Sequence, residues 1–257
     1  MGYFKINLDS IVAGLTHQKG NLVALIRYCH YHNLKLVKPQ FTLCSQHNNG
    51  TKLKTDLSEY YDLNSITVNG KPYTLYDDQL NIPWTVTKKK YKWGLLVKDE
   101  MFGNYLGEGE FIAKGVTVRK DTANVHIPYT IKLHCLAQKI SSSLGDYMCV
   151  HVRRGDRVIT PQIDADTQAE HIKEVIGLHK PDKVYIMTNR LSEISQLDEA
   201  SNVFFYTHYP VLKSITDNYY LFCVENIIMD SATIRCSTFK TNTNKYHCYL
   251  TDHPGWQ

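Results

Sequence analysis

Residues 147–156 read YMCVHVRRGD, an apolar run that passes directly into a cluster of charged side chains. An apolar run of this kind is typical of a strand buried on both faces of a parallel sheet. Side chains alternate along a strand, so we expect His151 and Arg153 on one side and Arg154 on the other, where Arg154 can pair with Asp156. Because ligands bind beyond the carboxyl ends of parallel strands, this segment predicts a ligand site at Arg153.

The chain downstream of this segment alternates between strand-like and helix-like patterns. In order, we expect a helix at 167–179, a strand at 184–188, a helix at 192–200, a strand at 203–206, a helix at 216–224 and a strand at 226–229. Strands that alternate with helices favour an α/β fold with a doubly wound parallel sheet. The polar side chains at the carboxyl ends of these strands are therefore the first candidates for a functional site.

The first forty residues predict one β-α-β unit. We expect a strand at 3–8, a glycine-containing loop, a helix with apolar residues at helical spacing up to Cys29, and a strand at 34–37. Further along, the pair Asn69-Gly70 lies between two short apolar runs and predicts a β-hairpin.

A boundary between two halves is expected in the middle of the chain. Apolar residues share one helical face over 126–140, and the run Ser-Ser-Ser-Leu-Gly at 141–145 interrupts that pattern. We therefore place the boundary after residue 143, with an N-terminal half at 1–143 and a C-terminal half at 144–257.

Composition excludes several classes of protein. Of the 257 residues, 43% are hydrophobic and 21% are charged, which is not the balance of a disordered chain. The longest uninterrupted apolar run is Tyr219–Val224, far short of the roughly 20 residues that a membrane-spanning helix needs. A net charge of +4 is also too small for a nucleic-acid-binding surface, so it favours a small anionic ligand.

The cysteine pattern indicates the type of cellular compartment. The seven Cys residues form no C-x-x-C pair, and several lie in apolar surroundings, which favours buried free thiols in a reducing compartment. The first residues lack a basic segment followed by an apolar one, so we expect a cytoplasmic protein, with a trimmed secretory-pathway protein as the alternative.

The charged cluster also carries a resemblance. His151-Val152-Arg153-Arg154-Gly155-Asp156 is similar to the H-x-R-R-x-D motif of the fucosyltransferase superfamily that includes the α1,2-, α1,6- and protein O-fucosyltransferases. Further segments resemble that superfamily in the same order, namely 13–19 (its G-G-L-N-Q-Q-R loop), 34–39 (its L-V-x-P strand), 57–63 (its F-x-D-I-F-D segment), 183–189 and 217–233 (its second and third strand motifs). Thr16 and Lys19 depart from the loop motif, where the superfamily has Asn and Arg.

The resemblance implies a GT-B-like architecture, with two Rossmann-type halves whose parallel sheets face a cleft. It implies an inverting, metal-independent glycosyltransferase that moves a sugar, with L-fucose from GDP-fucose as the first choice, onto a glycan or protein hydroxyl. The N-terminal half would hold the acceptor and the C-terminal half the nucleotide-sugar donor. Two alternatives stay open: the same fold with another donor such as UDP-xylose, and a non-catalytic module that binds a nucleotide sugar or a glycan.

Individual residues take roles from the same resemblance. Arg153 would neutralise the donor diphosphate, since a guanidinium is permanently charged and can grip two oxygens at once, and His151 would contact the donor. The other residues that the resemblance assigns to donor binding are Gly14 and Leu15, in a loop over the sugar-phosphate, and Asp217, Ser231, Ala232 and Thr233, around the nucleotide and phosphates.

The expected sugar transfer also raises two questions, namely which residue acts as the base and whether the protein binds a metal ion. An inverting transfer benefits from a base that takes the acceptor proton, for which His17, Asp62 and Glu59 are candidates. Asp164-Ala165-Asp166 has the D-x-D form of metal-dependent glycosyltransferases, but we interpret these carboxylates as helix-capping or surface groups. We therefore expect neither a metal nor a cofactor.

Overall fold

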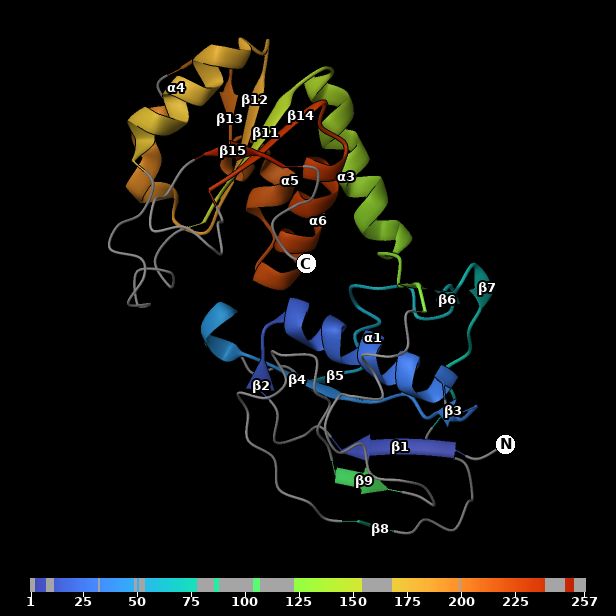
Figure 1. The fold of residues 1–257 in the computed structure, drawn as a ribbon. Coiled ribbons are helices and arrows are strands. Elements are labelled where there is room, and N and C mark those ends of the chain that lie inside the picture. Colours follow the sequence, from blue (N-terminus) through green and yellow to red (C-terminus); the bar gives the residue numbers. More distant parts are fainter. Residues whose placement is uncertain are drawn as a thin grey trace. The chain divides into compact units, whose positions relative to one another are not determined.

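The computed structural model describes residues 3–7, 12–31, 33–48, 50, 54–77, 86–87, 104–106, 123–153, 168–198, 200–238 and 248–251 (Figure 1). The chain divides into two compact units, Met1–Ile131 and Lys132–Gln257. The sequence predicts a boundary after residue 143, whereas the contacts place helix α3 (Ile131–Leu144), except for its first residue, in the second unit. Among the described helices, none is both long and apolar enough to cross a lipid bilayer.

The first unit is built around helix α1 (Leu15–Tyr31). Its strands are β1 (Tyr3–Asn7), β2 (Val12–Ala13), β3 (Lys35–Leu36), β4 (Phe41–Leu43), β5 (Lys54–Thr55), β6 (Thr67–Val68), β7 (Lys71–Pro72), β8 (Val86–Thr87), β9 (Asn104–Leu106) and β10 (Val125–His126), with a short 3-10 helix η1 (Ser45–His47). They form sheets of order β3-β1-β9-β8, β2-β4-β5 and β10-β6-β7. Strands β1 and β3 are parallel and flank α1 in the chain, which confirms the predicted β-α-β unit.

Two local predictions in this unit have different outcomes. The hairpin at Asn69-Gly70 is confirmed, because both residues have positive φ (52° and 75°) and join β6 to β7. The loop expected around 13–19 is wrong, because α1 begins at Leu15 and continues through Gly20. Leu15, Leu22 and Ile26 are buried on the inner face of this helix, so the apolar pattern extends further towards its start than the glycines suggested.

The second unit contains a five-stranded sheet of order β13-β12-β11-β14-β15. Its strands are β11 (Met148–Val152), β12 (Val184–Thr188), β13 (Val203–Phe204), β14 (Ile234–Ser237) and β15 (Tyr249–Leu250), and its helices are α3, α4 (Ala169–His179), α5 (Pro210–Lys213), α6 (Asn218–Asp230) and the 3-10 helices η3 (Leu191–Leu197) and η4 (Tyr206–His208). Strands β13, β12, β11 and β14 are parallel, and β15 is antiparallel to β14. The predicted α/β class with a parallel sheet is therefore present in this unit.

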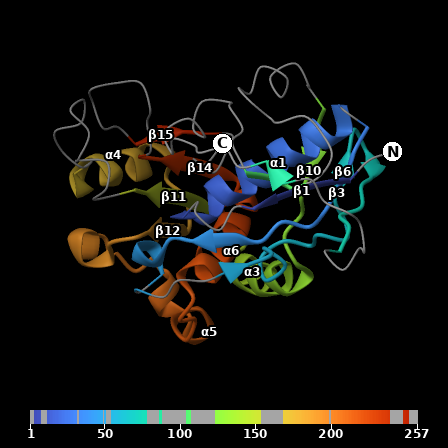
Figure 2. The ribbon, with the colours of Figure 1, turned by 90° about the horizontal axis from the view of Figure 1, so that it is seen from below.

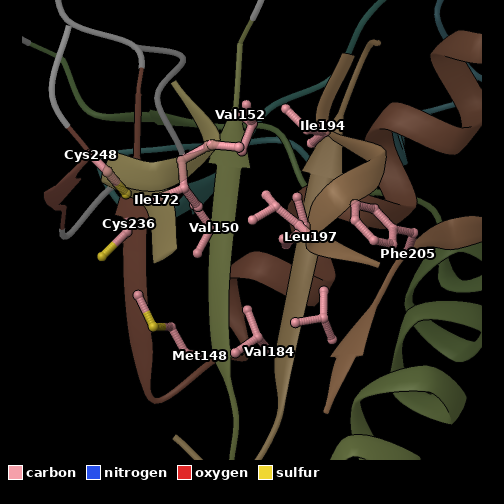
Figure 3. Packing of buried hydrophobic residues seen from close by; sticks show 13 residues of the cluster. Met148, Val150, Val152, Ile172, Val184, Ile194, Leu197, Phe205, Cys236 and Cys248 are labelled. Atoms are coloured by element: carbon pink, nitrogen blue, oxygen red, sulfur yellow. The ribbon is translucent and has the colours of Figure 1, made fainter. Parts of the chain in front are cut away.

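Helices cover both faces of this sheet, with α4 on one side and α6 on the other (Figure 2). On the α4 side, Met148, Val150 and Val152 of the central strand β11 pack into one apolar cluster with Ile172 and Ile194 (Figure 3). Burial of apolar surface on both faces explains why this strand has an almost unbroken apolar sequence.

On the α6 side, the helix is attached to the sheet by two buried hydrogen bonds. The Tyr147 hydroxyl donates to the Ile228 carbonyl, and the Tyr185 hydroxyl donates to Glu225 Oε1 at 3.0 Å. Burial raises the pKa of Glu225 to about 8, against the lowering effect of the Tyr185 hydrogen bond. The carboxyl group is therefore protonated at neutral pH, and α6 places no buried charge against the strands.

Two predicted elements need correction. The strand expected at 226–229 is part of α6, which is buried over most of its surface and so has the apolar run of a buried strand. The true strand, β14, follows at Ile234–Ser237. Helix α3 starts at Ile131 instead of 126 and continues through the serines to Leu144, where Gly145 (φ 75°) ends it.

Candidate functional site

Polar residues gather where β11 and β14 end in the second unit. Strand β11 continues into Arg153, and β14 continues into Thr238. The register pairs His151 with Ser237 on one side and with Met187 on the other, so these strand ends lie at the same edge of the sheet. We call this set, made of His151, Arg153, Ser237 and Thr238, the carboxyl-edge site.

The backbone of Arg153 is held by the neighbouring strand. The Arg153 N–H donates to Thr238 Oγ1 at 3.0 Å, and the Thr238 N–H donates to the His151 carbonyl at 3.0 Å. Thr238 is fully buried, whereas Arg153 is partly exposed. These bonds fix the backbone of Arg153, a residue with a permanent positive charge, at the carboxyl edge.

His151 contributes no charge to this site. Its side chain is 3% exposed, and burial, with a smaller contribution from the positive charge of Arg153, lowers its pKa to about 3. The imidazole is therefore neutral at physiological pH. It can exchange hydrogen bonds with a ligand, but the positive charge in this part of the site comes from Arg153.

Asp217 caps helix α6. Its Oδ1 accepts hydrogen bonds from the backbone N–H groups of Tyr219 (2.8 Å) and Tyr220 (3.2 Å). Helix α6 connects β13 to the parallel strand β14, so it begins on the side of the sheet where β13 ends, which is also the side of Arg153. Asp217 therefore lies on the same side of the sheet as Arg153, and its carboxylate is the N-cap of α6.

The predicted group Ser231, Ala232 and Thr233 lies at the opposite edge of the sheet. Ser231 donates to the Ile227 carbonyl at 2.9 Å, Ala232 is buried, and Thr233 Oγ1 donates to Asp146. The Thr233 N–H donates to the Tyr147 carbonyl, immediately before β11 begins. These residues therefore precede β14, and the structure does not bring them to Arg153.

Ser237 and Thr238, in contrast, lie at the carboxyl edge beside the end of β11. Both are fully buried at the end of β14, and Thr238 bonds directly to Arg153. The sequence did not single them out, because it placed the last strand at 226–229, inside α6, while the Ser231–Thr233 group came from the superfamily resemblance. The signal was present in the short run Ile-Arg-Cys-Ser-Thr at 234–238, which follows the end of that apolar segment.

A hollow in the second unit lies between α3 and α6. It has a volume of about 450 Å³, and its lining includes Gln138, Ser141 and Ser231. This hollow shares Ser231 with the amino edge of the sheet, and Arg153 does not line it. We therefore base the functional interpretation on the carboxyl-edge site, where a permanent charge is positioned.

In the first unit, the predicted loop residues Gly14 and Leu15 lie at the start of α1. Leu15 is 2% exposed, so its side chain belongs to the core and not to a loop over a ligand. A Cβ at position 14 would lie 3.2 Å from His47 Nδ1, so a larger residue between β2 and α1 would displace the His47 ring by a few tenths of an ångström. Only the backbone around Gly14 can therefore serve the predicted contact with a sugar-phosphate.

Lys19, one of the two departures from the superfamily loop, lies over a pair of aromatic rings. Its Nζ is 5.0 Å from the ring centre of Tyr61 and 5.4 Å from that of Tyr129. The two rings are stacked, with their centres 5.2 Å apart. Cation–π attraction therefore holds this ammonium group at the rings.

The three candidate bases have different surroundings. His17, in the first turn of α1, and Glu59 are exposed. Asp62 is partly buried, and its carboxylate accepts hydrogen bonds from the Asn64 N–H (3.1 Å) and from the Ser65 hydroxyl (2.6 Å). These bonds close a turn that follows Asp62, so its carboxylate stabilises the local fold.

Other predicted groups fall outside the part of the chain that the structure describes. They are Arg154, Asp156 and the pair Asp164 and Asp166. Within the described ranges, no three His, Cys, Asp or Glu side chains are grouped so that they could hold a metal ion.

Comparisons with known proteins find similarity in structure but not in sequence. No family model matches the chain, and no curated protein matches its sequence. The structure of NodZ α-1,6-fucosyltransferase soaked with GDP-fucose is 12% identical over 99% of this chain and 100% of that one, with a TM-score of 0.55. Fucosyltransferase NodZ from Bradyrhizobium is 11% identical over 99% of this chain and 100% of that one, with a TM-score of 0.53. POFUT1 in complex with GDP is 12% identical over 92% of this chain and 90% of that one, with a TM-score of 0.52.

At these identities the likeness shows the fold alone. The chain is an α/β protein with parallel sheets, structurally similar to GT-B fucosyltransferases.

Proposed function

We propose that this protein is an inverting, metal-independent glycosyltransferase that transfers a sugar from a nucleotide-sugar donor to a glycan or protein hydroxyl. The observation that carries the proposal is the position of Arg153, whose backbone is fixed by Thr238 at the carboxyl edge of a parallel sheet. The fold likeness supports it, since one similar structure was soaked with GDP-fucose and another is in complex with GDP. GDP-fucose is therefore the first donor to test.

In this proposal the protein consists of two Rossmann-type halves that face a cleft. The half that contains the carboxyl-edge site binds the donor, and the N-terminal half binds the acceptor. The backbone around Gly14 reaches the sugar-phosphate, and Ser237 and Thr238 replace the Ser231–Thr233 group beside the phosphates.

The chemical role of Arg153 follows from where charge develops. When the bond between the anomeric carbon and the diphosphate breaks, negative charge builds up on the departing diphosphate oxygen. A guanidinium held beside that oxygen stabilises the transition state more than the bound donor, which lowers the barrier. Because the guanidinium grips two oxygens at once, it supplies the charge that a metal ion supplies in other glycosyltransferases.

A base takes the proton of the acceptor hydroxyl as that oxygen attacks the anomeric carbon. Of the candidates, His17 and Glu59 are exposed and keep their acceptor atoms accessible. Asp62 is a weaker candidate, because both of its carboxylate oxygens already accept hydrogen bonds from Asn64 and Ser65 within the turn.

Two alternatives remain within reach of the same experiment. A different donor, such as UDP-xylose, is favoured by the departures at Thr16 and Lys19, since contacts in the pocket select the donor. A non-catalytic module would bind a nucleotide sugar without transferring it. The first would change which nucleotide binds, and the second would leave binding intact without turnover.

The experiment measures the melting temperature and the release of free nucleotide with GDP, GDP-fucose, UDP and UDP-xylose, with and without EDTA. A ligand at 100 times its Kd stabilises the folded protein by about 2.7 kcal/mol, which is readily detected. We expect GDP and GDP-fucose to stabilise the protein, and GDP release from GDP-fucose to persist in EDTA. Loss of turnover in EDTA that manganese restores would contradict the metal-independent mechanism, and stabilisation by UDP compounds alone would reassign the donor.

A further inference from the structure

Two cysteines lie together at the edge of the second unit's sheet. Cys236 is in β14, and Cys248 immediately precedes β15. The antiparallel register pairs Cys236 with Leu250 and Ser237 with Tyr249, so Cys248 lies diagonally across from Cys236 on the same side of the sheet. Both cysteines belong to the buried apolar cluster, where Figure 3 shows their sulfur atoms at its margin.

The two thiols also interact directly. A hydrogen bond between their side chains lowers the pKa of Cys236, while that bond and burial raise the pKa of Cys248. Cys236 is therefore the thiol that loses its proton first, with the Cys248 S–H donating to it. This is an arrangement of a nucleophilic thiol beside a resolving thiol.

Another cysteine near this pair faces the other way. Cys149 lies in β11, next to Val150, which is the residue that pairs with Cys236. Because side chains alternate along a strand, Cys149 points to the α6 face, whereas Val150 and Cys236 share the α4 face. Burial raises the pKa of the Cys149 thiol, so Cys149 is less reactive than Cys236.

We propose that Cys236 and Cys248 form a reversible disulfide by exchange with a low-molecular-weight disulfide such as oxidised glutathione, and that this bond ties β15 to β14. The Cys236 thiolate attacks one glutathione sulfur, forms a mixed disulfide and releases one glutathione. Cys248 then loses its proton to solvent and attacks the Cys236 sulfur, which releases the second glutathione. Two protein thiols are oxidised, and one glutathione disulfide is reduced to two thiols.

The position of the two cysteines lets glutathione disulfide reach them, and it also determines which segment the disulfide restrains. Strand β15 pairs with β14 over only two residues, and short outer strands open locally at low free-energy cost. The residues that follow Cys236 are Ser237 and Thr238, so the bond restrains the segment that holds the backbone of Arg153. The modification stands independently of the proposed function, because it depends only on the two thiols.

The test uses the full-length protein equilibrated in glutathione buffers of graded ratio, followed by alkylation of free thiols and mass spectrometry of the digest. We expect one intramolecular link, between Cys236 and Cys248, that dithiothreitol reverses. The link closes a loop of about a dozen residues, so the melting temperature should rise by about 5 °C or more on oxidation. Cys248→Ala should abolish both the link and the rise, whereas Cys149→Ala, the matched control, should abolish neither.

Two results would overturn the proposal. One is alkylation of both Cys236 and Cys248 in the wild-type protein at every glutathione ratio, a result that does not depend on whether a variant folds. The other is a link from Cys236 to Cys149, which would show that the α4-face pairing is not the reactive one.

Discussion

The two edges of the five-stranded sheet use polar residues differently. At the amino edge, side chains attach structural elements to each other: Tyr147 bonds to α6, Thr233 bonds to Asp146, and Ser231 bonds within the end of α6. At the carboxyl edge, a buried threonine side chain holds the backbone of Arg153, and the arginine extends beyond the strand. The amino-edge bonds thus join elements of the fold to each other, whereas the carboxyl-edge bond fixes the backbone of the arginine on which the proposed function depends.

Replacing Arg153 should have the largest effect on activity. Arg153→Lys keeps the charge and loses the planar two-pronged grip, so donor turnover should fall at least about tenfold while the melting temperature changes little. Arg235→Lys is the matched control, because Arg235 lies in β14 of the same sheet and pairs with Asp230 at 3.9 Å, away from the carboxyl edge. Turnover at the wild-type level in Arg153→Lys would remove this residue from the site and leave a likeness of fold alone.

A pair of threonine variants tests the contrast between the edges. Thr238→Val keeps the shape and removes the acceptor of the Arg153 N–H, which should cost about 1–3 kcal/mol of stability and weaken GDP binding several-fold. Thr233→Val removes the bond to Asp146 at the amino edge and should lower stability without changing GDP affinity. Calorimetric titration of both variants with GDP measures the contrast. Equal affinity losses would show that the two edges do not differ in function.

Much of the second unit was predictable from local sequence. Strand β11 has an almost unbroken apolar sequence, interrupted only by His151, ahead of a charged cluster, so both its position and its burial were evident. Strand β12 agrees with the prediction at both ends. Both strands are buried on both faces, and such burial gives a nearly continuous apolar sequence that can be recognised without the structure.

The misplacement of β14 had a physical cause that local sequence could not resolve. Helix α6 is buried from Cys223 to Met229, so its end has the composition of a buried strand. Short apolar runs do not distinguish the two structures by periodicity. That ambiguity hid the strand that ends at Ser237, whereas the Ser231–Thr233 group came from the superfamily resemblance.

The contact between Thr238 and Arg153 was beyond prediction for a different reason. It depends on the register of β11 and β14, which lie 85 residues apart at these positions. Nothing in either segment specifies which residues become neighbours across the sheet. The same holds in the first unit for Lys19 and the two tyrosine rings, which come from separate segments.

The buried histidine of the carboxyl edge predicts an acid-dependent loss of stability. The pKa of His151 is about 3 in the folded protein and near 6.5 when it is exposed, so the unfolded chain binds one more proton between these values. Its contribution to stability is complete above pH 6.5 and declines as the pH falls towards 3, by up to about 1.4 kcal/mol per pH unit. Urea unfolding at pH 7, 6 and 5 should therefore show a smaller decline for His151→Asn than for the wild type. An identical decline in both would mean that the imidazole is protonated in the folded state.

The smallest expected effect concerns Asp217, which lies on the carboxyl side but bonds in the manner of the amino edge. Its Oδ1 accepts from the backbone of Tyr219 and Tyr220, so the contrast between the edges assigns it to the fold. Asparagine caps helices about as well as aspartate, so Asp217→Asn should cost no more than about 0.5 kcal/mol, whereas Asp217→Ala should cost about 1 kcal/mol. GDP affinity should stay within about twofold in Asp217→Asn, because a carboxylate turned towards the helix N-terminus contributes little to an anionic ligand. Calorimetric titration with GDP and thermal unfolding of both variants separate the two roles. A large change in affinity in Asp217→Asn, with stability unchanged, would place this carboxylate in the nucleotide pocket and would show that one residue at this edge can cap a helix and bind the donor.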